Sequence, residues 1–305
     1  MIQAKKLTKA FDGFPALRGL DLTVEQGSVY GLIGRNGAGK TTLLQLLCGV
    51  YRPDSGQIAF DGAPVWENPE IKARIAVISD HPTFAAGETL CSMEKNYGRI
   101  YSRWDRETFA AVTGSLELDI RKPLRGFSKG MKKQAALALA LASKPDFLLM
   151  DEPMDGLDPV VRRQIRQMLL NEVAERQATV LIASHNLQEL EGVCDHIGLI
   201  RGGVMAAESD LDDLKNSVCK VKAAFRGGFP DQLASRLDIV HRESLGSLET
   251  LIVRGDADGI KRCLVETDPL VLELLPLTLE EIFIYQLGGE HDEIDNRDNQ
   301  VMEQA

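Results

Sequence analysis

The chain has 305 residues, of which 44% are hydrophobic and 26% are charged, as expected of a globular protein with a buried core. Its net charge of −10 argues against nucleic acid as the main partner, because a phosphate backbone is bound by a basic surface. No apolar run approaches the roughly 18 residues of a membrane span and no signal peptide is evident, so we expect a chain that does not cross a membrane by itself.

Two short strands are predicted near the N-terminus, at residues 2–7 and 20–25. Apolar and polar residues alternate in the second, which gives that strand one buried face. The segment between them, residues 9–15, combines glycine and proline with Phe11 and Phe14. We therefore expect a turn-rich loop that exposes both aromatic rings.

The next apolar run leads into residues 34–42, Gly-Arg-Asn-Gly-Ala-Gly-Lys-Thr-Thr, which fit the phosphate-loop pattern G-x-x-x-x-G-K-[ST] without a mismatch. Such a loop turns its backbone N–H groups onto phosphate oxygens, and the helix that follows adds its positive N-terminal end. Lys40 is expected to reach the β- and γ-phosphates, and the Thr41 hydroxyl is expected to ligate Mg²⁺. The predicted nucleotide-binding residues are Gly34, Arg35, Asn36, Gly37, Ala38, Gly39, Lys40, Thr41 and Thr42. Alone, the loop predicts a bound nucleoside triphosphate but does not indicate which class of nucleotide-binding protein this is.

After a buried strand at residues 74–79, strand patterns disappear and helical patterns dominate. We therefore expect a helical subdomain at about residues 80–143. Within it, Ser128 can cap an Ala/Leu-rich helix at residues 129–142. A capped helix N-terminus is also an anion site, so capping alone and phosphate binding are both open interpretations of this serine.

Two continuous apolar strands follow, at residues 147–150 and 178–183, and such runs suit a parallel sheet covered on both faces. The first leads into Asp151 and Glu152, at the sheet edge where ligands bind in doubly wound folds. We expect Asp151 to hold Mg²⁺ through water and Glu152 to polarise an attacking water as general base. The second leads to His185, which can donate a hydrogen bond to a γ-phosphate and orient the catalytic pair.

The last third of the chain changes character. Asn186 and Glu189 resemble a capping box at a helix start. Residues 216–288 alternate weak strands and short helices, which indicates a small accessory α/β module, and Thr278 with Glu281 predicts a capping box at its last helix. Residues 289–305 hold half of the net negative charge, and we expect a disordered acidic tail there.

Four motifs together resemble the nucleotide-binding subunit of ABC transporters in their order and approximate spacing. They are the phosphate loop, Leu-Leu-Met-Asp-Glu-Pro at 148–153, Gly-Leu-Asp at 156–158 and Ser-His at 184–185. The resemblance covers about residues 1–215. It implies an α/β fold of the P-loop NTPase, ABC-ATPase type, with a parallel-sheet core, an antiparallel β subdomain and a helical insertion, followed by the C-terminal α/β module.

The resemblance also implies roles for residues outside the phosphate loop. Phe11 would stack on adenine, with Phe14 as the alternative, and Asp158 would link two such sites across a dimer. The signature motif would contact ATP bound to a second copy in trans. Its residues are Ser128, Lys129, Gly130 and Met131.

Two positions depart from the family pattern. The signature reads Phe-Ser-Lys-Gly-Met where the family has Leu-Ser-Gly-Gly-Gln, so Lys129 adds a positive charge and Met131 removes an amide. Similar Ser-Lys-Gly-Met forms occur in single-domain subunits of ABC-2-type exporters, which often carry a C-terminal extension. Asp80 stands where the family has a mobile glutamine, and we expect its carboxylate still to face Mg²⁺.

These features predict an ATPase subunit of an ABC exporter that uses ATP and Mg²⁺. Lys40, Glu152 and His185 would be catalytic, and Thr41, Asp151 and Asp80 would face the metal. Two copies, or this chain and a paralogue, would close around two ATPs and drive a separate integral membrane permease. The permease would dock near residues 80–100, and the protein would lie in the cytoplasm at the inner face of the membrane.

Two alternatives come from other classes. One is a soluble ABC ATPase that acts on ribosomes or DNA ends, and the other is a single-domain ABC ATPase in iron–sulfur cofactor assembly. The single phosphate loop, the lack of heptads and the acidic balance count against the first. The C-terminal module and the export-like signature count against the second. The sequence does not indicate the transported substrate.

Overall fold

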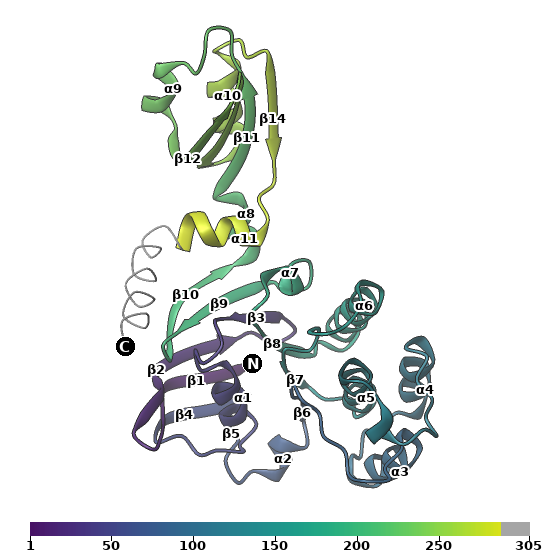
Figure 1. Cartoon of the computed structure of the whole chain (residues 1–305). Coiled ribbons are helices and arrows are strands. Elements are labelled where there is room, and N and C mark those ends of the chain that lie inside the picture. Colours follow the sequence, from purple (N-terminus) through teal and green to yellow (C-terminus); the bar gives the residue numbers. More distant parts are fainter. Residues whose placement is uncertain (288–305) are drawn as a thin grey trace, which may run out of the picture. The chain divides into compact units, whose positions relative to one another are not determined.

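The computed structural model describes residues 1–287, so the predicted acidic tail at 289–305 lies outside the described residues. The chain divides into two compact units, the first spanning Met1–Glu208 and the second beginning at Ser209 (Figure 1). No helix among residues 1–287 is both long and apolar enough to span a membrane.

The first unit contains two sheets and a helix whose leucines join a core common to both sheets. The antiparallel sheet has the order β2–β1–β4–β5, formed by β1 (Ile2–Phe11), β2 (Phe14–Val24), β4 (Ser55–Phe60) and β5 (Ala63–Pro64). The second sheet has the order β10–β9–β3–β8–β7–β6, formed by β3 (Val29–Ile33), β6 (Ile75–Ile78), β7 (Phe147–Asp151), β8 (Thr179–Ser184), β9 (His196–Arg201) and β10 (Val204–Asp210). Strands β9, β3, β8, β7 and β6 run parallel. Helix α1 (Lys40–Leu47) buries four leucines in the core that also holds side chains of both sheets.

The N-terminal hairpin differs from the loop expected at residues 9–15. Strand β1 continues to Phe11 and β2 begins at Phe14, so only Asp12 and Gly13 remain in the turn, with φ of 48° and 84°. An Asp-Gly pair with positive φ at both positions is the preferred two-residue hairpin turn. The proline that suggested a loop lies on β2, an edge strand, where a missing N–H is tolerated.

The helices between β6 and β7 gather on one side of the first unit (Figure 1). They are α3 (Leu90–Ile100), α4 (Arg106–Ser115), the 3₁₀ turn η1 (Leu124–Gly126) and α5 (Lys129–Ala142). The other helices of this unit are α2 (Pro69–Lys72), α6 (Pro159–Arg176) and α7 (Leu187–Leu190). The apolar face of α5 is almost fully buried, which fixes the direction in which its N-terminal turn projects.

The second unit has ferredoxin-like topology. Its elements are α8 (Leu211–Asn216), β11 (Val218–Ala224), α9 (Asp231–Arg236), β12 (Asp238–Leu245), β13 (Leu248–Arg254), α10 (Ala257–Val265), β14 (Val271–Leu275), α11 (Leu279–Ile282) and η2 (Phe283–Leu287). The strand order is β12–β13–β11–β14, and all three neighbouring pairs are antiparallel. Two strand–helix–strand segments thus interleave, as in the split β-α-β arrangement.

Two details of this unit bear on the sequence predictions. The capping box of Thr278 and Glu281 is confirmed, because each side chain bonds the backbone of the other residue. Strand β12 was not predicted, since it is a largely exposed edge strand whose sequence lacks apolar alternation.

Candidate functional site

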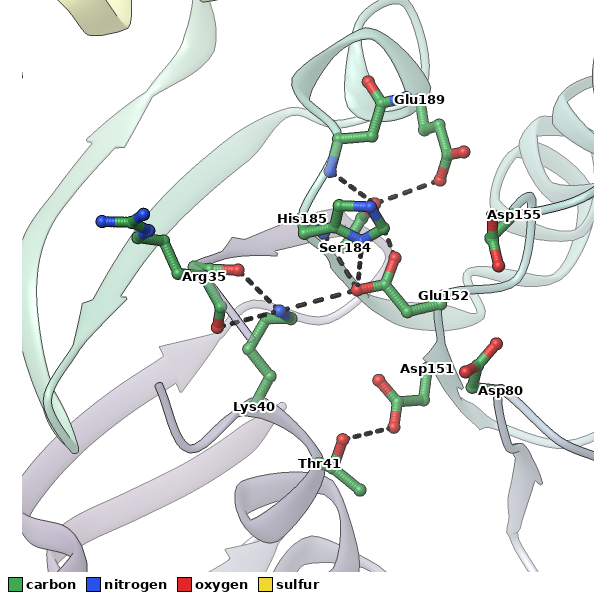
Figure 2. Close-up of polar contacts among 12 residues, drawn as sticks. Arg35, Lys40, Thr41, Asp80, Asp151, Glu152, Asp155, Ser184, His185 and Glu189 are labelled. Carbon is green, nitrogen blue, oxygen red and sulfur yellow. Dashed lines mark hydrogen bonds and ion pairs between the residues drawn. The ribbon is translucent and has the colours of Figure 1, made fainter. Parts of the chain in front are cut away.

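The ends of four adjacent parallel strands meet at one edge of the six-stranded sheet. Strand β3 leads into the phosphate loop, β8 ends at Ser184, β7 leads to Glu152, and β6 leads to Asp80. Parallel strands in a sheet end on the same side, so residues far apart in the sequence come together here (Figure 2).

Two glycines of the phosphate loop are required by close contacts. A Cβ on Gly39 would lie 2.8 Å from the carbonyl oxygen of Ala16, and its φ of +112° strains any other residue. A Cβ on Gly34 would lie 2.6 Å from the carbonyl oxygen of Ile200. Gly39 also begins α1 without a side-chain cap, so the first N–H groups of the helix are available to an anion.

Lys40 is buried and lies inside the loop. Its Nζ donates hydrogen bonds to the carbonyl oxygens of Gly34 at 2.6 Å and Arg35 at 3.4 Å, and it lies 3.5 Å from Glu152 Oε1 (Figure 2). The ammonium is thus held between the loop and the carboxylate that follows β7.

Thr41 and Asp151 contact each other beside this lysine. Thr41 Oγ1 donates to Asp151 Oδ2 at 2.7 Å. Burial raises the pKa of Asp151, and the Glu152 and Asp80 carboxylates raise it further, against the hydrogen bond from Thr41. A bound cation would relieve this excess of negative charge, and hydroxyl and carboxylate oxygens suit Mg²⁺. The described residues hold no group of three or more His, Cys, Asp or Glu that could bind a metal.

Glu152 is held by donors on both carboxylate oxygens. Its Oε1 accepts the backbone N–H of His185 at 3.0 Å and lies 2.9 Å from His185 Nδ1, while Ser184 Oγ lies 3.1 Å from its Oε2. Its backbone has φ of +47°, a conformation that costs about 1 kcal/mol or more for a non-glycine residue and often marks functional sites. The structure thus brings Lys40, Glu152 and His185 together.

A cavity of about 290 Å³ adjoins Lys40, Thr41 and Glu152. It is lined by Phe14, Ala16, residues of the phosphate loop, Asp80, Asp151 and Glu152. Phe14 is 70% exposed and borders the cavity, whereas Phe11 packs edge-on against Tyr51 with ring centroids 5.2 Å apart. The structure therefore brings Phe14, not Phe11, to the phosphate loop.

Asp80 also lines the cavity, but it contacts lysines rather than Thr41 or Asp151. Its Oδ1 lies 2.8 Å from Lys133 Nζ and 3.1 Å from Lys129 Nζ. Lys129 Nζ also donates to Asp155 Oδ2 at 2.9 Å. Burial opposes ionisation of Asp80, but the hydrogen bonds from both lysines outweigh it, so the pKa of this carboxyl lies below its usual value.

The signature segment begins α5 and does not line the cavity of its own chain. Ser128 Oγ accepts the backbone N–H of Met131 at 3.2 Å, which confirms the predicted N-cap. Ser128 and Lys129 are exposed, and Gly130 and Met131 are partly exposed. Asp158 caps α6 by accepting N–H groups of residues 160 and 161, so within one chain it has a local structural contact.

Three residues that contact the candidate site residues were not identified as such from the sequence. Lys133 lies in an Ala/Leu-rich helix, and Asp155 lies in the loop after β7; neither position carried a signal. Glu189 was expected to form a capping box with Asn186, which is wrong: the Asn186 side chain accepts from Gln188 instead, and Glu189 lies beside Ser184.

Comparison with known proteins gives a consistent result. A family model described as ABC transporter matches residues 17–155. The ABC transporter ATP-binding protein YtrB of Bacillus subtilis is 36% identical over 290 residues, covering 95% of this chain and 99% of YtrB. The Nod factor export ATP-binding protein I of Cupriavidus pinatubonensis is 31% identical over 300 residues, covering 95% and 91%. A dimeric ATP-binding cassette solved in a post-hydrolysis state with ADP and Pi shares the fold with a TM-score of 0.63, at 22% identity over 69% of this chain and 99% of that one.

Proposed function

This chain belongs to the ABC transporter family as an ATP-binding, ATP-hydrolysing subunit, and we propose that two nucleotide sites form between two copies, each site made from both chains. The observation that carries the proposal is the separation of two anion-binding elements. The phosphate loop and Glu152 line one cavity, whereas the exposed segment 128–131 begins α5 and does not line it. A second copy, or a paralogue, that places its residues 128–131 over the nucleotide would complete the site. The dimeric fold relative with bound ADP and Pi supports this arrangement.

Within one site, each residue has a distinct proposed role. Lys40 leaves the carbonyls of its own loop and binds the β- and γ-phosphates, and Glu152 polarises the attacking water. His185 holds Glu152 Oε1 through its backbone N–H, and its imidazole donates to the γ-phosphate. Thr41 and Asp151 would hold Mg²⁺, which neutralises charge on the phosphates when bound.

The adenine is proposed to stack on Phe14 because this ring borders the cavity. Phe11 was the residue favoured by the family resemblance, and its contact with Tyr51 places it against another ring. Asp158 is proposed to contact the second chain in addition to capping α6.

The partner and location are proposed from the relatives. We propose an integral membrane permease of an exporter, docked near residues 80–100, with this subunit on the cytoplasmic face of the membrane. The Nod factor export relative supports export. We further propose an ABC ATPase domain at residues 1–215, with a helical subdomain at about 80–143, and an accessory module at 216–288.

Replacing Glu152 with glutamine tests the central role. The variant should bind ATP, lose hydrolysis and accumulate as a dimer in light scattering after chromatography with ATP and Mg²⁺. Lys40→Ala is the matched control, since it should neither bind ATP tightly nor dimerise. Hydrolysis by Glu152→Gln at the wild-type rate would show that Glu152 is not the general base.

Mixing two inactive variants tests whether each site is shared. Lys40→Ala damages the phosphate loop, and Ser128→Arg damages the signature. In a mixed dimer one site is intact and the other carries both defects. Each mixed dimer has one working site of two, so mixing the variants should restore ATP hydrolysis to at most about half of the wild-type rate, whereas each variant alone stays inactive. Absence of any recovery would contradict the shared site.

A further inference from the structure

A second buried carboxyl lies behind Glu152 and is connected to it by one hydroxyl. Ser184 Oγ lies 3.1 Å from Glu152 Oε2 and 3.0 Å from Glu189 Oε2 (Figure 2). The same oxygen accepts the backbone N–H of Asn186 at 3.0 Å. Ser184 is fully buried and Glu189 is 3% exposed, so bulk water does not compete for these contacts.

The number of protons decides how these contacts are made. A serine hydroxyl has one proton and two lone pairs, and the Asn186 N–H uses one lone pair. If both glutamates were ionised, the single proton could serve only one of them. The other carboxylate would then face an oxygen with no hydrogen between them. All three contacts are satisfied only when one carboxyl is protonated and donates to Ser184, while Ser184 donates to the other.

The surroundings decide which carboxyl carries the proton. Glu152 has the Lys40 ammonium 3.5 Å from its Oε1, and the same oxygen accepts the backbone N–H of His185. Glu189 has a more distant cation, Arg162, whose Nη1 lies 3.9 Å from its Oε1. Arg166 Nη2 donates to the backbone carbonyls of residues 188 and 189.

The electrostatic surroundings of Glu189 act in the same direction. Burial raises the pKa of the Glu189 carboxyl, and the nearby Glu152 and Asp155 carboxylates raise it further. The hydrogen bond with Ser184 and the charge of Arg162 oppose this shift. The net shift favours the neutral acid.

We propose that Glu189 is a neutral carboxylic acid that donates to Ser184 and thereby orients the Ser184 hydroxyl as a donor to Glu152. Glu189 is a positioning residue, because it acts through Ser184 and does not touch the nucleotide. The proposal rests on the role of Glu152 as general base. His185 fixes one oxygen of that carboxylate and Ser184 fixes the other, so the carboxylate is held in one orientation toward the attacking water.

Infrared spectroscopy of the full-length protein at pH 7 tests the protonation state without using activity. The wild-type minus Glu189→Gln difference spectrum should show the carbonyl stretch of a protonated carboxyl and no change in the carboxylate bands. A carboxylate band in this difference would overturn the proposal. If the infrared result holds but Glu152→Gln still hydrolyses ATP, the role of Glu152 fails while the state of Glu189 stands.

Kinetics test the positioning role. Glu189→Ala should lower kcat about tenfold, the effect of one lost hydrogen bond, while KM for ATP changes less than about twofold because Lys40 and Thr41 are untouched. Glu189→Gln supplies an N–H donor of the same shape and should keep kcat within about threefold. Gln188→Ala, an exposed side chain on the same helix, is the control and should leave kcat unchanged.

A double variant distinguishes loss of the contacts from Glu189 through Ser184 to Glu152 from a general loss of structure. Ser184→Ala should lower kcat as much as Glu189→Ala does. The double variant should lower kcat no further than either single variant, because the two residues act as one unit. Multiplicative losses, or a Glu189→Gln defect as large as that of Glu189→Ala, would overturn the positioning role.

Discussion

Replacing Asp80 with asparagine is expected to destabilise the first unit, because the Lys133 ammonium loses its nearest counter-charge. Lys133 is 1% exposed, and three oxygens lie within 3.1 Å of its ammonium nitrogen. These are Asp80 Oδ1 at 2.8 Å, the Glu152 carbonyl at 2.5 Å and the Asp155 carbonyl at 3.1 Å. Asparagine keeps the shape of Asp80 but removes its charge.

Two limits bracket the change in the free energy of unfolding. Removing one partner of a fully buried ion pair costs about 3–5 kcal/mol, and a single hydrogen bond to a charged group contributes about 1.5–3 kcal/mol. The Asp80 side chain is 29% exposed, and the Asp155 carboxylate stays 3.8 Å from the Lys133 ammonium. Both facts favour the lower range, about 2 kcal/mol. For a unit of this size the melting temperature should fall by about 4–8 °C.

Thermal unfolding followed by circular dichroism measures this change. Asp54→Asn, which removes an exposed ion pair with Lys9, is the matched control and should melt much closer to wild type than Asp80→Asn does. Adding Lys133→Met to Asp80→Asn should recover most of the loss, since no buried charge is then unpaired. The reasoning is refuted if Asp80→Asn melts within about 1 °C of wild type, or if the double variant melts no higher than the single one.

The same contact predicts a dependence on pH. The pKa of Asp80 is lower in the folded chain than in the unfolded one, because the lysine hydrogen bonds outweigh burial. Such a carboxyl stabilises the fold above its unfolded pKa of about 4, and this contribution is lost as pH falls through the lower folded pKa. The difference in stability between wild type and Asp80→Asn should therefore shrink below about pH 4 in the same melting assay.

Three further results are expected at the nucleotide site. Phe14→Ala should weaken ATP binding about tenfold in a fluorescent-nucleotide titration, from a stacking energy of about 1–3 kcal/mol, and a larger effect of Phe11→Ala would reverse the assignment. Asp151→Asn should raise the Mg²⁺ concentration for half-maximal hydrolysis about tenfold or more, and an unchanged midpoint would exclude Asp151 as a metal residue. Gly39→Ala should abolish ATP binding in equilibrium dialysis while the chain stays folded, because its Cβ would meet the Ala16 carbonyl; tight binding by this variant would show that the loop tolerates the clash.

The fold was largely predictable because its central strands are buried on both faces. Strands β7 and β8 read as unbroken apolar runs, which few other local structures produce. Strand β12 was not predictable in this way, since its exposed edge position leaves no apolar pattern. The Asp12-Gly13 turn was available as a hairpin signal, but the neighbouring proline was given more weight.

The residues of the phosphate loop and of the strand ends could be identified from the sequence, but the side-chain contacts that surround them could not. A phosphate loop and a strand that ends in two carboxylates are local patterns. The contacts of Lys133 with Asp80 and Asp155 join α5, the β6 exit and the loop after β7, segments that are adjacent only in three dimensions. Ser184 and Glu189 are close in sequence, yet the regular capping pattern suggested a different partner for Glu189.

The two departures from the family pattern, Asp80 and Lys129, lie far apart in the sequence but are in direct contact in the structure. By the family resemblance Asp80 stands at a glutamine position and Lys129 at a glycine position, and Asp80 Oδ1 lies 3.1 Å from Lys129 Nζ. Together with Lys133 and Asp155 they form a cluster of two positive and two negative groups. A substitution back to the family residue at one position therefore unbalances this cluster, since it removes one of four paired charges. The signature lysine and the aspartate after β6 are best understood as one neutral unit that must be changed together.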